Sequence, residues 1–402
     1  MFNLEYFIAN NVTKRTKSMC NLDIAQNYEY LSKKICNKSV LVIGGAGSIG
    51  SSFIKAILQF QPSSLVVVDT NENAMTELTR DLRSTKGIYI PIDYITYPMD
   101  FASPVFKKMF LNRGGFDIVA NFSAHKHVRS ERDIYSIEAL ILNNVLNART
   151  LLDLLAELPP EEFFCVSTDK AANPVNIMGA SKRIMEDVIF SYSDKFPVKT
   201  ARFANVAFSN GSLPAGFLER IQKLQPLSAP RDVKRYFVSP EESGQICLLS
   251  CILGDNRAIF FPKLTEAQMM TFASIGTALL EAHGFRVLEC SSDKEAIDKA
   301  EALKNGSSLY PVHYSISDTT GEKPFEEFVT ETETTDMNRY RSLGVITGKT
   351  IPDKERLEKL LKDLKHAFDK EETTKEGIIS IIKAYLPNFK HIETGKSLDN
   401  RM

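Results

Sequence analysis

Short apolar runs alternate with amphipathic stretches through the first half of the chain. Residues 39–43 form a β-branched run, and Phe53, Ile54, Ile57 and Leu58 follow it at helical spacing. The same alternation predicts further strands at 65–68, 89–92, 116–121, 162–166 and 200–203, and helices at 72–82, 136–158 and 176–192. Strands and helices that alternate in this way form a parallel sheet covered by helices. We therefore predict an α/β fold with a doubly wound parallel sheet.

The turn between the first strand and the first helix reads GGAGSIG at residues 44–50. Its glycines match a dinucleotide fingerprint of the Rossmann type in two registers, 45/47/50 and 44/47/50. Glycines here permit a tight turn and bring a pyrophosphate against a helix N-terminus, although a plain glycine-rich turn is the alternative. The candidate cofactor-binding residues of this turn are Gly44, Gly47, Ser48, Ile49 and Gly50.

Two aspartates follow the next predicted strands. Asp69 ends the second strand, where a carboxylate binds adenosine ribose hydroxyls and repels a 2′-phosphate, which favours NAD over NADP. The alternative for Asp69 is a helix N-cap, and Arg80 and Arg83 could still reach a phosphate. Asp93 follows the predicted third strand and is a candidate adenine contact.

Amino-acid composition excludes several classes of protein but does not indicate a reaction. The 402 residues carry 49 basic and 50 acidic side chains, which gives no field for nucleic acid or an anionic membrane. Six cysteines lack any C-x-x-C spacing, which favours reduced core thiols and predicts no metal site. No signal peptide or stretch of 18 apolar residues is evident, so we expect a cytoplasmic protein without a membrane span.

An acid, a basic side chain and a second lysine follow the strand at 162–166. Thr168, Asp169 and Lys170 lie at its end, and Lys182 stands four residues after Met178 on the next predicted helix. Helical spacing places Met178 and Lys182 on one face. Taken singly, Met178 is a core residue and Lys182 a solvated one, but their joint spacing after Thr168 predicts an active site.

Composition divides the chain into four regions. Residues 1–38 form a predicted helical N-terminal arm, with Ile24, Tyr28, Leu31 and Ile35 at helical spacing. Residues 39–204 form the NAD-binding Rossmann domain, and the loop-rich residues 205–316 form mainly a smaller substrate-binding subdomain. Residues 317–402 form a charged helical C-terminal extension, with a helix at 353–368, for which we expect a role in assembly or as a lid.

With the glycine turn, SAHKHV (123–128), STDKAANP (167–174) and MGASKR (178–183) in this order, the chain resembles the extended short-chain dehydrogenase/reductases. Within them it is similar to the nucleotide-sugar 4,6-dehydratases of bacterial polysaccharide biosynthesis, above all the UDP-N-acetylglucosamine 4,6-dehydratases with Met in place of the catalytic tyrosine, here Met178. The tail stretches DTTGEK (318–323) and PNFKHIETGK (387–396) also look similar. The resemblance implies NAD as cofactor, a UDP-sugar substrate and a homo-oligomer.

The resemblance also implies roles for loop residues. It places Ala124 at the cofactor and His125, Lys126 and His127 near the sugar, although a structural hydrogen bond is an equal alternative for the histidines. It places Lys182 at the nicotinamide ribose. Candidate contacts to the UDP group are Asn205, Ser209, Arg231 and Arg235, with a solvated turn after Pro230 as the alternative for the arginines.

The implied reaction oxidises the sugar at C4, removes water across C5 and C6, and returns the hydride to C6. Asp169 and Lys170 fit the acid and the base, and Lys170 is a base only when neutral, so we expect burial or Lys182 to lower its pKa. Met178 cannot ionise, so the C4 hydroxyl proton leaves through Asp169, Thr168 or water, and we favour Asp169.

Two other functions remain open at this point: a nucleotide-sugar 4-epimerase, and a non-catalytic NAD-sensing protein of the same fold. The pair Asp169 and Lys170 disfavours both. An epimerase needs C4 proton transfer, for which the missing tyrosine is a handicap, and a sensor needs no acid–base pair.

Overall fold

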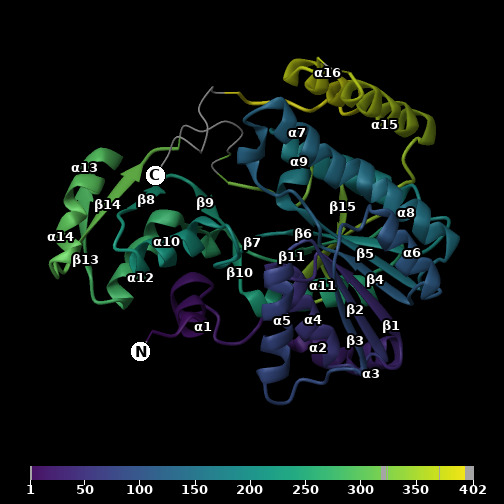
Figure 1. Cartoon of the computed structure of the whole chain (residues 1–402), viewed down its shortest axis with the longest axis horizontal. Coiled ribbons are helices and arrows are strands. Elements are labelled where there is room, and N and C mark those ends of the chain that lie inside the picture. Colours follow the sequence, from purple (N-terminus) through teal and green to yellow (C-terminus); the bar gives the residue numbers. More distant parts are fainter. Residues whose placement is uncertain (1, 318–322, 324, 371, 394–402) are drawn as a thin grey trace.

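The computed structural model describes residues 2–317, 323, 325–370 and 372–393. In this part of the chain the main sheet comprises β1 (Ser39–Ile43), β2 (Ser64–Asp69), β3 (Asp93–Pro98), β4 (Ile118–Asn121), β5 (Glu162–Thr168), β6 (Val198–Phe203), β11 (Ile259–Pro262), β15 (Thr334–Asp336) and β16 (Leu343–Thr347). Their order is β15-β16-β11-β6-β5-β4-β1-β2-β3 (Figure 1). Strand β16 is antiparallel to both of its neighbours, β11 and β15, and all other neighbouring strands are parallel. The predicted α/β fold with a Rossmann-type doubly wound sheet is confirmed.

Helices cover both faces of this sheet. They are α2 (Asn21–Gln26), α3 (Tyr28–Ile35), α4 (Ser48–Leu58), α5 (Glu72–Ser84), α6 (Pro104–Asn112), α7 (Ile134–Ile141), α8 (Asn147–Glu157), α9 (Ile177–Phe190), α11 (Pro240–Leu253), α15 (Lys354–Phe368) and α16 (Lys375–Tyr385). Helices α4 and α11 pack together on one face, α7 to α9 cover the other, and α15 and α16 lie outside α7 to α9 (Figure 1). The strand order changes direction between the parallel neighbours β1 and β4, since β2 and β3 lie on one side of β1 and β4 and β5 on the other. Ligands of such sheets bind at this point, at the carboxyl ends of the strands.

A smaller unit lies beside the sheet (Figure 1). It contains α10 (Leu213–Gln222), α12 (Phe272–Ala282), α13 (Asp293–Lys299), α14 (Glu301–Lys304) and a sheet of β13 (Arg286–Cys290), β14 (Leu309–Ser315) and β8 (Leu227–Pro230). Short pairs join it to the main domain, namely β7 (Asn205–Val206) with β10 (Phe237–Val238), and β9 (Lys234–Arg235) with β12 (Met270–Thr271). Short helical turns stand at Val128–Glu131, Asp169–Ala171 and Glu266–Gln268.

The four regions predicted from the sequence do not coincide with the units that pack together in the structure. Strands β15 and β16 lie in the extension that was expected to be helical, and β11 and α11 lie in the predicted subdomain yet belong to the main domain. The N-terminal arm divides: α1 (Leu4–Phe7) and a π-helix at Ile8–Val12 pack into the core of the smaller unit, whereas Leu31 and Ile35 of α3 pack into the main core. Residues 318–322 and 394–396 of the tail motifs lie outside the described residues.

The third strand begins where the sequence placed its end. Pro91 interrupts the predicted run and has no N–H to donate, and β3 starts at Asp93, in register with Ser64 at the start of β2. Asp93 therefore lies at the amino end of the strand, at the edge opposite the ligand crevice, and its carboxylate binds Arg113 at 2.9 Å. The prediction that Asp93 contacts adenine was wrong. The carboxyl end of β3 leads instead to Met99, whose N–H donates to Asp69 O at 3.0 Å.

Candidate active site

The glycine turn has backbone geometry that other residues would disrupt. Gly44 has φ +70°, and a Cβ there would lie 2.6 Å from Ser123 N. A Cβ on Gly50 would overlap the backbone of Gly44 and Gly45. Gly47 is the N-cap of α4, so the first turn of that helix, with Ser48 and Ile49, faces the crevice at the carboxyl ends of β1 and β4. The turn thus has the close packing and the helix N-terminus that a pyrophosphate requires.

Asp69 stands beside this turn at the carboxyl end of β2. Its Oδ2 accepts a hydrogen bond from Ala46 N at 3.0 Å, and its Oδ1 accepts one from Asn71 N at 2.9 Å. The alternative role as N-cap of α5 was wrong, because Asn71 caps that helix through Ala74 N. Arg80 pairs with Glu77 on the exposed face of α5. Asp69 thus lies where a ribose carboxylate is needed.

The predicted helix at 136–158 is interrupted by a π-helical turn, Leu142–Leu146, that supports the loop after β4. Asn144 in this turn is buried; its Oδ1 accepts from His125 N at 2.9 Å, and its Nδ2 donates to His125 O at 2.9 Å. Asn144 Nδ2 also lies 3.1 Å from Ser181 Oγ on α9. A single amide therefore fixes the loop that carries Ala124 and His125 relative to the helix that carries Lys182, a use typical of π-turns.

A second loop, residues 207–212, meets the glycine turn and the histidine loop. Asn210 N donates to Ser48 Oγ at 2.9 Å, and Lys126 Nζ donates to Asn210 O at 3.1 Å. Gly211 lies against the His127 imidazole. The structure thus brings together the predicted cofactor residues and this loop, which also carries Ser209 and follows Asn205 of β7. Partial burial lowers the pKa of His125 and of Lys126 below their usual values.

The turn that carries the predicted acid and base, Asp169–Ala171, follows β5 directly and is called the acid–base turn below. Asp169 is 4% exposed, and its Oδ1 accepts hydrogen bonds from Thr168 Oγ1 at 2.8 Å, Lys170 N at 2.9 Å and Lys170 Nζ at 3.0 Å. Burial alone would lower the pKa of Lys170, but the carboxylates of Asp169 and Glu326 raise it above its usual value. The expectation of a lowered pKa was therefore wrong for this state of the site. Lys170 is an ammonium held between two carboxylates.

Glu326 is a site residue that the sequence did not indicate. Its side chain is 3% exposed, and its Oε1 lies 3.7 Å from Lys170 Nζ and 3.9 Å from Arg235 Nη2. Glu326 also lines a cavity of about 200 Å³ together with Tyr236, Glu266, Met269, Phe325, Glu327 and Phe328. It stands 156 residues after Lys170 with no spacing to mark it, and only a buried glutamate in a charged tail could have drawn attention to it.

The two predicted UDP-binding arginines lie in different surroundings. Arg235 is 5% exposed, and its Nη1 donates to Lys323 O at 2.9 Å, so the solvated-turn alternative was wrong for this residue. Arg231 is exposed; it pairs with Glu289 and donates to Tyr314 O at 2.9 Å on the smaller unit. The structure places Arg235 near the acid–base turn, whereas Arg231 lies next to the sheet β13-β14-β8 of the smaller unit.

Helix α9 follows the turn, begins at Ile177 and carries Met178 and Lys182. Met178 is buried in the main core, and its N–H donates to Glu131 Oε1 at 3.0 Å. Lys182 is 3% exposed, so its reading as a solvated residue was wrong; its Nζ donates to Val166 O at 2.7 Å. Burial lowers the pKa of Lys182.

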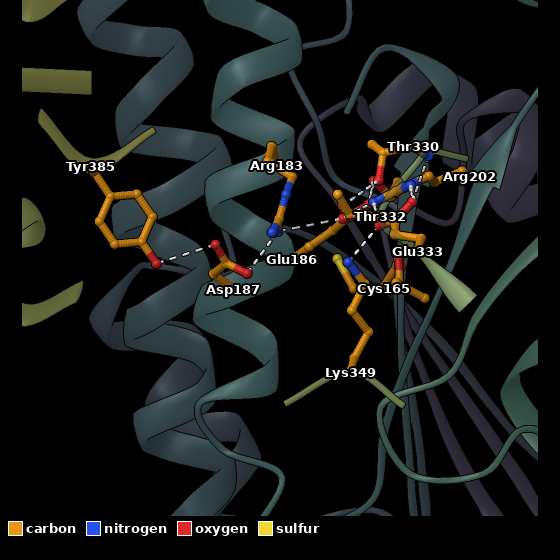
Figure 2. Close-up of polar contacts among 12 residues, drawn as sticks. Cys165, Arg183, Glu186, Asp187, Arg202, Thr330, Thr332, Glu333, Lys349 and Tyr385 are labelled. Carbon is orange, nitrogen blue, oxygen red and sulfur yellow. Dashed lines mark hydrogen bonds and ion pairs between the residues drawn. The ribbon is translucent and has the colours of Figure 1, made fainter. Parts of the chain in front are cut away.

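A buried network of polar contacts is centred on Arg202 and links it to Glu186 and Glu333 (Figure 2). Glu186 of α9 accepts from Ser167 Oγ at 2.7 Å and from Arg202 Nη2 at 2.8 Å. Arg202 of β6 also donates to Glu333 Oε2 at 2.7 Å, and Lys349 pairs with Glu333. This network joins β5, β6 and α9 to the segment that carries Glu326.

The chain is similar in sequence to several known proteins. The chain is 28% identical over 79% of its length to an "uncharacterized membrane protein" of Methanocaldococcus jannaschii, covering 88% of that protein, and 26% identical over 59% of its length to a UDP-N-acetylglucosamine 4,6-dehydratase (inverting) of Campylobacter jejuni, covering 70% of it. It is 25% identical over 67% of its length to a UDP-glucose 4-epimerase of Rickettsia bellii, covering 82% of it. Two longer relatives, CapD of Staphylococcus aureus and EpsC of Bacillus subtilis, are matched over only 47% and 39% of their lengths.

Among solved structures, Pen from Bacillus thuringiensis superposes with a TM-score of 0.62 at 20% identity, covering 82% of this chain and 98% of that one. DesIV, a dTDP-glucose 4,6-dehydratase from Streptomyces venezuelae, gives 0.54 at 18% identity, covering 87% and 97%. Among these proteins, those whose names give an activity are nucleotide-sugar dehydratases and epimerases. Residues 40–347 match the model of the polysaccharide biosynthesis protein family, and the chain belongs to that family.

None of the helices in the described part of the chain is both long and apolar enough to cross a membrane.

Proposed function

We propose that this protein catalyses the NAD-dependent 4,6-dehydration of UDP-N-acetylglucosamine to a UDP-4-keto-6-deoxy-N-acetylhexosamine used in surface polysaccharide or glycan biosynthesis. The observation that carries the proposal is the Asp169–Lys170 pair at the end of β5, in contact at 3.0 Å. An elimination across C5 and C6 needs both a base and an acid, whereas an epimerisation at C4 needs neither at that position. The Campylobacter relatives that bear this activity in their names support the choice of substrate.

The residues around the glycine turn fit a nicotinamide dinucleotide. The turn has no room for a Cβ at Gly44 or Gly50, and Asp69 lies beside it. When bound, the cofactor supplies the hydride acceptor and donor. The Asp69 carboxylate accepts hydrogen bonds from the adenosine ribose hydroxyls, and its negative charge disfavours a cofactor with a 2′-phosphate. We expect Asp69→Ala to weaken NAD binding and to improve NADP binding, as measured by calorimetry; a wild-type preference for NADP would contradict this role.

The chain's own groups divide the proton transfers. Lys170 takes the hydrogen from C5 as a neutral amine, and Asp169 takes the C4 hydroxyl proton and delivers one to the leaving C6 hydroxyl. Thr168 donates to Asp169 and holds that carboxylate in place. Lys182 orients the nicotinamide ribose, for which its ammonium must leave Val166 O or share its protons with a second acceptor. Arg235 provides a cation for the UDP group.

The direct test is incubation with UDP-N-acetylglucosamine in deuterated water, followed by NMR of the product. We expect a 4-keto-6-deoxy sugar that carries deuterium at C5, because the base removes that hydrogen and a solvent-derived proton replaces it. No net consumption of added NAD is expected. A product changed only in its C4 configuration would establish the alternative, a 4-epimerase. The similarity to the UDP-glucose 4-epimerase of Rickettsia bellii is the observation that supports this alternative.

A further inference from the structure

Glu326 reaches the active site from a distant part of the chain. Its carboxylate lies 3.7 Å from Lys170 Nζ, on a segment that is attached at both ends. On one side, Lys323 Nζ donates to Asn173 O at 2.6 Å. On the other side, Glu333 is bound by the fully buried Arg202 of β6. The fold thus presents a carboxylate to Lys170 from a fixed support.

The surroundings of Glu326 make its carboxylate easier to protonate than an exposed one. Burial raises the pKa of Glu326 above its usual value, and Asp169 adds to this effect while Lys170 and Arg235 oppose it. The ionisable groups that face it are Asp169 and Lys170 of the acid–base turn, Arg235 of β9, Lys323 of its own segment, and Glu266 and Glu327 on the shared cavity. Asp169, in contrast, already accepts three hydrogen bonds at Oδ1.

We propose that Glu326 is a positioning residue that accepts the proton of the Lys170 ammonium and so supplies the neutral amine that the elimination needs. The inference rests on the proposed function, in which Lys170 is the C5 base. One N–H bond of Lys170 breaks and one O–H bond of Glu326 forms, without change in redox state or in the net charge of the pair. Lys170 then takes the C5 hydrogen, returns a proton to C5, and recovers the first proton from Glu326.

This transfer gives Lys170 a route to the neutral amine that does not require release of its proton to water. Releasing its proton to water would leave only a small neutral fraction at pH 7, because its pKa is raised above 10.5. Moving the proton within the pair does not depend on pH, since both forms carry the same number of protons. The distance of 3.7 Å must shorten to hydrogen-bond length, as contacts in substrate-free sites commonly do when substrate binds.

The first experiment follows the Lys170 side chain by NMR titration of its Cε signal in the substrate-free protein. Glu326→Gln removes one of the two carboxylates, so the pKa of Lys170 is expected to fall. The matched control is Glu327→Gln, because Glu327 is exposed and binds Asn173 Nδ2 at 2.9 Å; there the pKa of Lys170 is expected to stay unchanged. An unchanged pKa in Glu326→Gln overturns the proposal.

The second experiment measures kcat of dehydration from pH 6 to 10. Wild type and Glu327→Gln are expected to show a flat profile near neutrality. Glu326→Gln is expected to lose about 10²-fold or more at pH 7, because Lys170 must now release its proton to solvent. Its kcat is expected to rise about tenfold for each pH unit until the pH reaches the pKa of Lys170 in this variant. Glu326→Asp keeps a carboxylate and is expected to restore the flat profile. A loss that is equal at every pH shows a merely structural role and overturns the proposal.

The two experiments separate this inference from the proposed function. If the wild type forms no dehydrated product, the proposed function fails, and the titration alone decides whether Glu326 controls the charge of Lys170. If the wild type dehydrates its substrate and Glu326→Gln has the same pH profile, the function stands and the role of Glu326 is wrong.

Discussion

At the scale of single residues, the charge of Lys170 determines which chemical step it can perform. The sequence led us to expect a lowered pKa, because it shows the neighbouring basic groups but not the distant carboxylate. In the fold, Asp169 and Glu326 surround the ammonium and raise its pKa. Asp169 and Lys170 themselves could be found from the sequence, because they are adjacent and follow a strand; Glu326 could not, because only the tertiary fold brings it there.

Replacing Lys170 by Met should abolish elimination, since Met keeps much of the volume of the stem and removes the amine. Loss of a positioned base lowers kcat by about 10² to 10⁴. The measurement is product formation from UDP-N-acetylglucosamine by NMR, with deuterium at C5 as a second signal. Product formation at the wild-type rate would exclude Lys170 as the base.

The two arginines of the 231–235 segment offer a matched pair. Arg235→Ala should raise KM for the UDP-sugar by the equivalent of about 1.5–3 kcal/mol, the usual value of a charge-assisted contact, and lower kcat less. Arg231→Ala should leave KM unchanged, because Arg231 is paired with Glu289 of β13 in the smaller unit. Steady-state kinetics on both variants test this difference, and equal effects on KM would contradict the assignment.

At the scale of elements, the hydrophobic pattern predicted the central strands well and failed where other constraints dominated. Residues 39–43, the glycine turn and the helix at 176–192 were correct because apolar period, glycines and the Asn176 cap agree there. The third strand was misplaced because Pro91 was counted inside it, and β15 and β16 were missed because they are short and lie in a charged region. The helix at 353–368 was confirmed as α15, with Asp353 as its N-cap.

Helix α15 should be stabilised by its buried leucines and not by its surface charges. Leu364 is fully buried, so Leu364→Ala should lower the free energy of unfolding by about 2–5 kcal/mol. Lys359 on the same helix is exposed and pairs with Asp363 at 2.9 Å, so Lys359→Ala should change it by at most about 0.5 kcal/mol. Urea unfolding of both variants measures the difference; a cost for Leu364→Ala as small as that of Lys359→Ala would show that α15 is not part of the cooperative core.

At the scale of the whole molecule, the Arg202 network holds together parts that composition assigned to different regions (Figure 2). Arg202 is 0% exposed and binds Glu186 of α9 and Glu333 of the C-terminal segment. Tyr385 of α16 adds a contact to Asp187 at 3.2 Å. A buried arginine without both carboxylates would be strongly destabilising, so the C-terminal segment is an integral part of the fold.

This network predicts a dependence of stability on pH. Burial would raise the pKa of Glu333, but Arg202 and Lys349 outweigh it and lower the pKa from 4.5 to about 2. The stabilisation is therefore complete above about pH 4.5, amounts to at most about 3 kcal/mol, and is lost as the pH falls towards 2. Glu333→Gln should lower the melting temperature at pH 7, and its difference from wild type should shrink between pH 4.5 and 2.

Thermal unfolding at several pH values measures this effect. Glu331→Gln is the control, because Glu331 is an exposed neighbour, and it should follow the wild-type curve. A constant difference between Glu333→Gln and wild type across the whole pH range would show that the carboxylate charge of Glu333 does not contribute.

The packing of the first residues has a consequence for how the chain folds during synthesis. Phe7, Ile8 and Val12 belong to a hydrophobic cluster whose other buried members come from residues 207–312, and Arg15 binds Glu242, 227 residues further along. At about 5–20 residues per second, translation supplies these partners roughly 10 to 60 s after residues 4–12 have been made. A ribosome-bound chain that ends before this region must therefore keep its first apolar segment in solvent or on a chaperone.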